Sequence, residues 1–162
     1  MNNTACIERF YTAFGQKDWK SMQACYHDDV TFSDPVFQHL NAGEAKAMWH
    51  MLTAASKDLR VVLSEVAAQD NTGSCRWDAY YSFSRTGRSV HNIIHATFQF
   101  KDGLIIQHKD SFDLWRWSGM ALGLSGKLLG WTPMIQNRIR ATAMGNLKKF
   151  MEQNPGYLRP KM

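Results

Sequence analysis

The chain has 162 residues, of which 44% are hydrophobic and 20% charged, and its net charge is +5 at pH 7. This balance excludes a largely disordered chain, and the length favours one domain over two. No apolar run reaches the roughly 18 residues that a membrane span needs, and the N-terminus lacks the basic start and apolar run of a signal peptide. Three cysteines without CxxC spacing predict free thiols rather than a disulfide framework or a metal site. We therefore expect a cytoplasmic protein.

The basic residues are scattered, with a mild excess after Trp115, which is typical of a solvated helix face. A nucleic-acid partner would call for a basic stripe within a recognisable module, and none is expected here. A membrane-surface role for residues 119–131 is the competing interpretation. Lys127 is the only charge in that stretch, and its glycines weaken any helix, so no membrane partner is expected.

Two helices are predicted at the start of the chain. The first ends at Gly15, and its apolar residues recur at the i, i+3, i+4, i+7 spacing of an amphipathic helix: Ile7, Phe10, Tyr11 and Phe14. Asp18 fits the N-cap of a short second helix. Its apolar side would carry Trp19, Met22 and Tyr26.

A strand over 30–33 is closed by Asp34-Pro35, because proline cannot extend the hydrogen-bond ladder. Asp34 therefore lies at a strand end, where side chains are often functional. Asn41 and Glu44 have the spacing of a capping box. They open a third helix, whose predicted apolar face is Met48, Met51, Leu52 and Ala55.

Four strands are predicted next, over 59–66, 76–84, 89–100 and 104 to about 115. A two-residue loop at Thr86-Gly87 would place Phe83 opposite Val90. The nearly all-apolar, buried face of this hairpin then carries Trp77, Ala79, Tyr81, Phe83, Val90, Asn92, Ile94, Ala96, Phe98 and Phe100. The opposite face carries Arg76, Asp78, His91, His95, Thr97 and Gln99. With an even register, the last strand also points Ile106, His108, Asp110 and Phe112 inward, unless a bulge flips its face.

The composition after Trp117 becomes small, apolar and glycine-rich. Thr132-Pro133 then reads as an N-cap and first helical residue. The apolar face of the helix that they open is Ile135, Ile139, Ala143, Leu147 and Phe150. Residues 118–150 are expected to form either a lid or part of a dimer contact.

Residues 26–35 read Y-x-D-D-x-T-x-x-D-P, which resembles the segment of ketosteroid isomerase that ends in its catalytic aspartate. Over about residues 3–115 the chain resembles the NTF2-like superfamily, and within it the SnoaL-like and ketosteroid-isomerase-like proteins. The resemblance implies an α+β cone of three N-terminal helices on a curved, mixed and mostly antiparallel sheet. The core would cover about 3–117 and an added C-terminal helical segment about 118–154. It also implies a homodimer formed by the outer sheet face that carries His91, His95 and Thr97.

The resemblance places Asp34 at the position of the isomerase's general base. Phe10 and Ala96 fall where the isomerase has the tyrosine and the protonated aspartic acid of its oxyanion hole. Neither side chain can donate a hydrogen bond, which disfavours steroid isomerisation. In SnoaL-like cyclases an aspartate on the sheet serves as acid and base, and His108 or Asp110 would take that part here. The strands show no inward arginine, which disfavours the arrangement of limonene-epoxide-hydrolase-like enzymes.

The predicted catalytic residues are thus Asp34, His108 and Asp110, with no metal and no cofactor. The alternatives are a turn-forming Asp34 and a purely structural His108–Asp110 pair. The predicted ligand-binding residues are Phe10, Phe14, Met48, Trp77, Tyr81, Asn92, Phe98 and Phe112. We expect cofactor-free proton transfer on a small hydrophobic molecule, of isomerase, cyclase or hydratase type. A non-catalytic carrier or sensor and a dimerising association module remain the alternatives.

Overall fold

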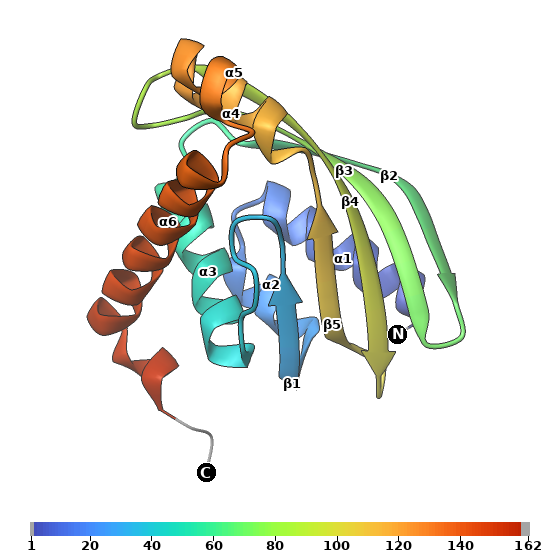
Figure 1. The fold of residues 1–162 in the computed structure, drawn as a ribbon. Coiled ribbons are helices and arrows are strands. Elements are labelled where there is room, and N and C mark those ends of the chain that lie inside the picture. Colours follow the sequence, from blue (N-terminus) through green and yellow to red (C-terminus); the bar gives the residue numbers. More distant parts are fainter. Residues whose placement is uncertain (1, 160–162) are drawn as a thin grey trace.

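The computed structural model describes residues 2–159 of the chain as an α+β fold in which helices cover one face of a curved sheet (Figure 1). The elements follow in the order α1 (Asn3–Gly15), α2 (Trp19–Ala24), β1 (Tyr26–Ser33), α3 (Ala42–Ala55), β2 (Arg60–Gln69), β3 (Thr72–Ser82), β4 (Ser89–Lys101), β5 (Leu104–Ser111), α4 (Leu114–Leu122), α5 (Leu124–Leu129), α6 (Pro133–Gln153) and the short 3-10 helix η1 (Pro155–Leu158).

The sheet has the strand order β1-β5-β4-β3-β2. β1 runs parallel to β5, whereas the other three pairs are antiparallel. α1 packs against β2 and β3, and α3 packs against β1, so the apolar core lies between these helices and the concave side of the sheet. The predicted architecture of N-terminal helices on a mixed, mostly antiparallel sheet is confirmed. The three cysteines are free, as predicted, and all three are buried.

The β3–β4 hairpin has a longer loop than predicted. Tyr81, and not Phe83, lies opposite Val90, because six residues separate the two strands. Within this loop Phe83 N donates to Arg88 O, and the Phe83 carbonyl accepts from Gly87 N. The pairing is displaced by two residues, an even number, so the predicted inward and outward faces survive the error.

β5 contains a bulge, which was predicted only as the alternative to an even register. Gln99 pairs with Gln107 but Phe100 pairs with Ile105, so Ile106 is the extra residue. Ile105 is therefore fully buried in place of the predicted Ile106, while His108 and Asp110 still point inward. The strand ends at Ser111, not near Trp115, because Asp113 caps α4 by accepting from Arg116 N.

The predicted apolar sides of two helices were wrong in part. Met22 and Met48 are buried and Met51 packs against the core, as predicted. In α3 the buried residues are Ala45, Ala47, Met48, Trp49 and Thr53, whereas Leu52 is exposed. Asn41 does cap this helix through Glu44 N. Tyr26 does not belong to α2, because the chain turns into β1 two residues after that helix ends.

The C-terminal segment folds as three helices beyond the sheet. α4 and α5 pack on each other at a glycine: a Cβ added to Gly126 would lie 1.9 Å from the Ser118 carbonyl oxygen. Thr132 caps α6 as predicted. α6 then runs along α3 toward the other end of the molecule (Figure 1). None of the helices within residues 2–159 is long and apolar enough to cross a membrane.

Candidate functional site

The parallel pair β1–β5 brings the two predicted aspartates together. Phe32 pairs with His108 and Ser33 with Lys109, so Asp34 and Asp110 occupy the next position along the same register. Their side chains share the inward side, because Phe32 and His108 are both buried there. Both aspartates thus lie where two neighbouring parallel strands end, a common location for ligand sites.

His108 forms the deepest polar group of the cone and has no solvent exposure. Its Nδ1 lies 2.7 Å from the Tyr26 hydroxyl, and its Nε2 lies 2.9 Å from Asp110 Oδ1. Trp49 Nε1 donates to the Tyr26 hydroxyl at 2.8 Å. Tyr11 OH is a longer contact, 3.4 Å from His108 Nε2.

These bonds assign the proton positions. When Asp110 is a carboxylate, which can only accept, the neutral tautomer of His108 that satisfies both contacts donates Nε2–H to Asp110 and accepts at Nδ1. Tyr26 then donates its hydroxyl proton to Nδ1 while its oxygen accepts from Trp49. Burial, partly offset by the Trp49 hydrogen bond, raises the pKa of Tyr26 well above its usual range, so the phenol keeps this proton. The result is a directed chain from Trp49 to Asp110.

Asp34 is held by one oxygen only. Its Oδ1 accepts from Val36 N at 2.7 Å and from Phe37 N at 2.6 Å, which fixes the carboxylate in the turn after β1. Its Oδ2 accepts no hydrogen bond from the described residues and keeps contact with solvent. Burial raises the pKa of Asp34 to about 7; the backbone N–H of Phe37 opposes this rise and the charge of Asp110 adds to it.

Two more inward groups have open hydrogen-bonding capacity. Asp110 uses Oδ1 for both His108 and Trp77 Nε1, so its Oδ2 has no bonded partner within residues 2–159. The Asn92 side chain is 7% exposed and likewise makes no hydrogen bond inside the described part of the chain. Ala96 pairs with Asp110, and Asn92 lies four residues from Ala96 along β4, about 13 Å away. Asp34 and Asp110 thus lie side by side at one level of the sheet, and Asn92 lies farther along β4.

The apolar side chains predicted to bind a ligand lie at two depths in the cone. The base is filled by side chains that are 7% exposed or less: Phe10, Phe14, Met48, Trp77 and Phe98. Phe98 and Phe32 pack on the His108 ring at centroid distances of 4.6 and 5.0 Å. Tyr81 and Phe112 are only partly buried and lie nearer the mouth. Aromatic rings therefore occupy the base of the cone around His108.

Two of the C-terminal helices are hydrogen-bonded to elements near the candidate site. On α4, Trp117 Nε1 donates to the Tyr81 hydroxyl at 2.8 Å. On α6, Arg140 Nε donates to the Pro35 carbonyl at 2.9 Å, which ties that helix to the turn holding Asp34. These two bonds tie α4 to β3 and α6 to the turn after β1.

Sequence analysis missed Tyr26, Trp49 and Tyr11 as parts of the polar centre. Tyr26 was assigned to a helix although it has the same inward parity as Val30 and Phe32, a signal visible once β1 is extended back to it. Trp49 was missed because the predicted apolar side of α3 included Leu52, whereas the buried side of this helix includes Trp49. Tyr11 was assigned to the core, where its ring lies.

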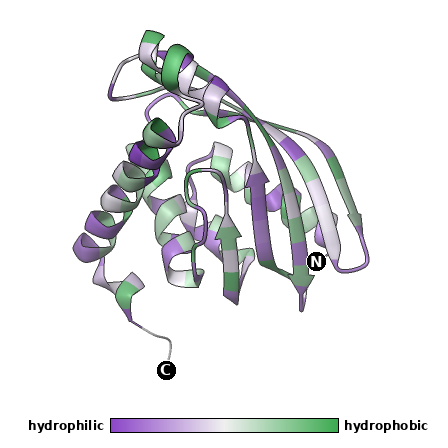
Figure 2. Cartoon of the chain, viewed as in Figure 1, coloured by the Kyte–Doolittle hydropathy of each residue, from purple (hydrophilic) through white to green (hydrophobic). Residues whose placement is uncertain are grey.

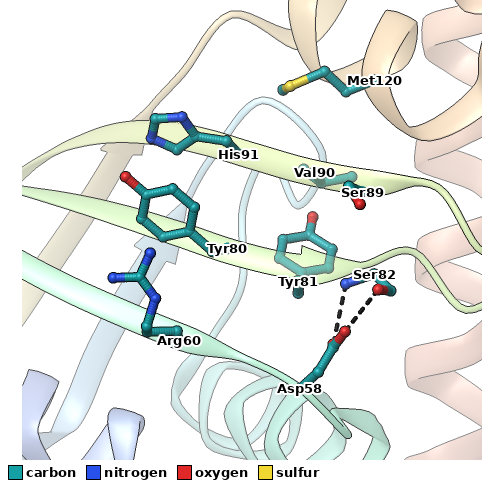
Figure 3. Close-up of a pocket in the computed structure, with 9 residues that line it drawn as sticks. All are labelled: Asp58, Arg60, Tyr80, Tyr81, Ser82, Ser89, Val90, His91 and Met120. Carbon is teal, nitrogen blue, oxygen red and sulfur yellow. Dashed lines mark hydrogen bonds between the residues drawn. The ribbon is translucent and has the colours of Figure 1, made fainter.

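The outer face of the sheet carries a separate polar arrangement. Asp78 accepts two hydrogen bonds from Arg76 and lies 2.7 Å from His91 Nε2. These contacts, Arg76 first, lower the pKa of Asp78 to about 2. Tyr80 stacks on the His91 ring with centroids 4.2 Å apart, and Arg60 lies over the other side of Tyr80. Arg60, Tyr80 and His91 also border a groove of about 490 Å³ that Met120 overhangs (Figure 3).

No group of three His, Cys, Asp or Glu side chains among residues 2–159 is placed to hold a metal ion.

A comparison with models of known protein families shows to which family the chain belongs. The model of the SnoaL-like domain matches residues 7–108, more than half of the chain. The protein belongs to the SnoaL-like family. The matched region of this SnoaL-like chain contains Asp34 and His108 and ends before α4, so the helices that follow β5 lie outside it. No curated protein sequence matches significantly.

Solved structures similar to this SnoaL-like protein share its NTF2-like fold. IdmH of Streptomyces antibioticus, a proposed polyketide cyclase, is 16% identical with a TM-score of 0.65, over 76% of this chain and all of its own. An epoxide hydrolase of the limonene-epoxide-hydrolase-like type from M. tuberculosis is 16% identical with a TM-score of 0.62, over 78% of this chain and 95% of its own. An NTF2-like protein of unknown function from Burkholderia pseudomallei is 16% identical with a TM-score of 0.59, over 70% and 92%. At these identities the likeness shows the fold alone.

Proposed function

We propose that this SnoaL-like protein is a cofactor-free acid–base enzyme acting on a small, mostly apolar molecule, with Asp34 as the base. One observation carries the proposal. Two adjacent inward carboxylates, Asp34 and Asp110, each have one oxygen anchored and the other open. A carboxylate whose pKa lies near 7 is matched to proton transfer at neutral pH.

The chemistry follows from the division of roles. Asp34 Oδ2 would take a proton from a carbon or hydroxyl of the substrate. The negative charge of Asp110 favours the protonated form of Asp34, which would then return the proton to another atom of the substrate. His108 holds Asp110 in place and is a positioning residue, because rings enclose it on every side that its hydrogen bonds leave. Isomerisation, cyclisation and hydration all fit such a pair. Steroid isomerisation through the known oxyanion hole stays disfavoured, because Phe10 and Ala96 are both apolar.

A substrate-independent test uses 5-nitrobenzisoxazole, a small apolar probe of buried bases. A base removes the ring C–H proton, the N–O bond breaks, and a nitrile with a coloured phenolate forms. We expect Asp34→Asn to lower this rate by at least about 100-fold. The wild-type rate should rise with pH and level off above about 7, where Asp34 is ionised.

Asp29→Asn is the matched control, because the Asp29 side chain on the same strand is 79% exposed. It should leave the rate unchanged. A wild-type rate that does not exceed that of the same concentration of acetate, or an Asp34→Asn variant as fast as wild type, would refute the assignment of Asp34 as a base.

A dimerising association module is the second candidate, favoured by the aromatic filling of the cone around His108. The outer sheet face would supply the contact, since His95 and Thr97 are exposed there. Analytical ultracentrifugation of wild type and His95→Glu tests it. If this candidate holds, the wild type sediments as a dimer, the His95→Glu variant sediments as a monomer, and neither protein shows base activity. A carrier would instead bind apolar probes without turnover.

A further inference from the structure

One end of the molecule carries a concentration of exposed apolar side chains. Six of the nine large apolar residues exposed within residues 2–159 lie on α4, α5, the turn that follows α5 and the start of α6, and Figure 2 shows strongly hydrophobic segments on these helices. We call this surface the apolar tip; its members, with their exposed fractions, are Trp115 (49%), Leu124 (71%), Leu128 (62%), Leu129 (44%), Trp131 (59%) and Met134 (71%). A cluster of this kind at the end of a soluble fold marks an interaction site.

Hydrogen bonds hold both tryptophans of the apolar tip against α5. Trp115 Nε1 donates to the Lys127 carbonyl at 2.9 Å, which ties α4 to α5. Trp131 Nε1 donates to the Leu128 carbonyl at 3.0 Å, which folds the chain after α5 back onto that helix. Leu124 and Leu128 are one helical turn apart and share a side of α5. The exposed rings and aliphatic chains are therefore held in place.

The packing of α5 on α4 explains why these side chains remain outside. The contact surface of α5 is glycine: Gly126 meets the Ser118 carbonyl, and a Cβ on Gly130 would lie 2.7 Å from Ser118 Cβ. Such close approach leaves no room for a leucine on the inner side. The large residues of α5 thus face solvent, although together they have enough apolar area for a substantial contact.

The charge around the apolar tip is mostly positive. Exposed cations lie on each of the three helices that bear it, namely Arg116, Lys127 and Arg138, and Asp113, the N-cap of α4, is the one acidic residue between positions 113 and 151. Lys127 lies between Leu124 and Leu128 on α5, and Arg138 lies one turn beyond Met134 on α6; both are exposed. A rim of cations around leucine, tryptophan and methionine is the composition of helices that lie in the interface of an anionic membrane.

We propose that the apolar tip docks the protein on an anionic lipid surface. A second copy of the chain is the weaker occupant, because a symmetric contact would bring the basic rims together. No membrane partner was predicted, because the glycines of residues 119–131 weaken a helix and Lys127 is the only charge in that stretch. In the structure α5 forms nonetheless, and α4 and α6 add further cations. The proposal is independent of the proposed base activity.

Co-sedimentation of the full chain with vesicles tests it. We expect vesicles of phosphatidylcholine with about one third phosphatidylglycerol to bind at least about tenfold more protein than pure phosphatidylcholine vesicles. This difference should shrink when salt is raised from about 0.1 M to about 0.5 M. The double variant Leu124→Gln/Leu128→Gln keeps good helix formers at exposed positions, so it should fold as wild type and bind at least about tenfold more weakly.

Leu52→Gln/Leu158→Gln is the matched control, because both leucines are exposed but lie outside the apolar tip. It should bind vesicles as wild type does, and so should Asp34→Asn, which separates docking from base activity. The proposal would be overturned if the wild-type protein did not bind phosphatidylglycerol vesicles, or if Leu124→Gln/Leu128→Gln bound them as strongly as wild type. A dimer that the tip variant splits, without vesicle binding, would overturn it in favour of a second copy.

Discussion

The protonation of Asp34 can be tested through stability alone, before any substrate is known. In the folded protein the pKa of Asp34 is about 7, against a usual value of 3.8. Between these two values the folded chain retains a proton that the unfolded chain releases. Raising the pH through this window therefore favours unfolding, because the folded state must come to bury a charge. Asp34→Asn removes this dependence while its side-chain oxygen still accepts from Val36 and Phe37.

The magnitude follows from the pKa difference. A difference of about three units corresponds to about 4 kcal/mol once Asp34 is fully ionised. Because Oδ2 keeps contact with solvent, about 2–4 kcal/mol is the expected range. The free energy of unfolding of Asp34→Asn, measured relative to wild type, should thus rise by this amount from about pH 4 to about pH 8. Contributions of other titrating groups cancel in that difference when they are distant from Asp34.

Urea unfolding followed by tryptophan fluorescence at a series of pH values measures this quantity. Asp29→Asn, an exposed aspartate on β1, supplies the baseline and should follow the wild-type curve. If the curves of Asp34→Asn and wild type ran parallel over the whole range, Asp34 would be ionised in the folded protein at low pH, and the reasoning would fail.

Two further predictions concern other parts of the fold. Gly126→Ala should destabilise the protein by about 1–3 kcal/mol in urea unfolding, because its Cβ has no room against α4. Gly145→Ala, in open space on α6, should be neutral or stabilising by up to about 1 kcal/mol; equal effects of the two would contradict the packing described. Asp78→Asn should lower stability at neutral pH by about 1 kcal/mol, since the pair with Arg76 and His91 is partly screened by solvent. Because the pKa of Asp78 is lowered to about 2, this difference should vanish as the pH falls from about 4 to about 2, and a difference that persists there would rule out the ion pair as its cause.

Local chemistry in the sequence predicted much of the fold. Asn41 and Thr132 cap their helices as expected, because a cap depends on residues within one turn. The inward face of β3 and β4 was also correct, since alternation survives an even shift in pairing. Asp34, His108 and Asp110 were all placed inward from parity and the resemblance.

What failed depended on contacts between distant segments. The bulge at Ile106 is set by how β5 fits β4, and no local pattern marks it. The buried side of α3 is fixed by Trp49 reaching Tyr26, a partner on another element. The hydrogen-bond chain through Tyr26 therefore could not be predicted, although each of its residues is an ordinary core residue in the sequence.

The parallel pairing of β1 with β5 also has a consequence for folding. It joins residues 26–33 to residues 104–111, across the whole of the antiparallel part of the sheet. Contacts of such high sequence separation bear the largest loop-closure entropy, so β1 is expected to dock after the β2–β5 meander has formed. The two carboxylates become neighbours only at that step. A partly folded chain would then lack the shifted aspartate, and base activity would report on completed folding.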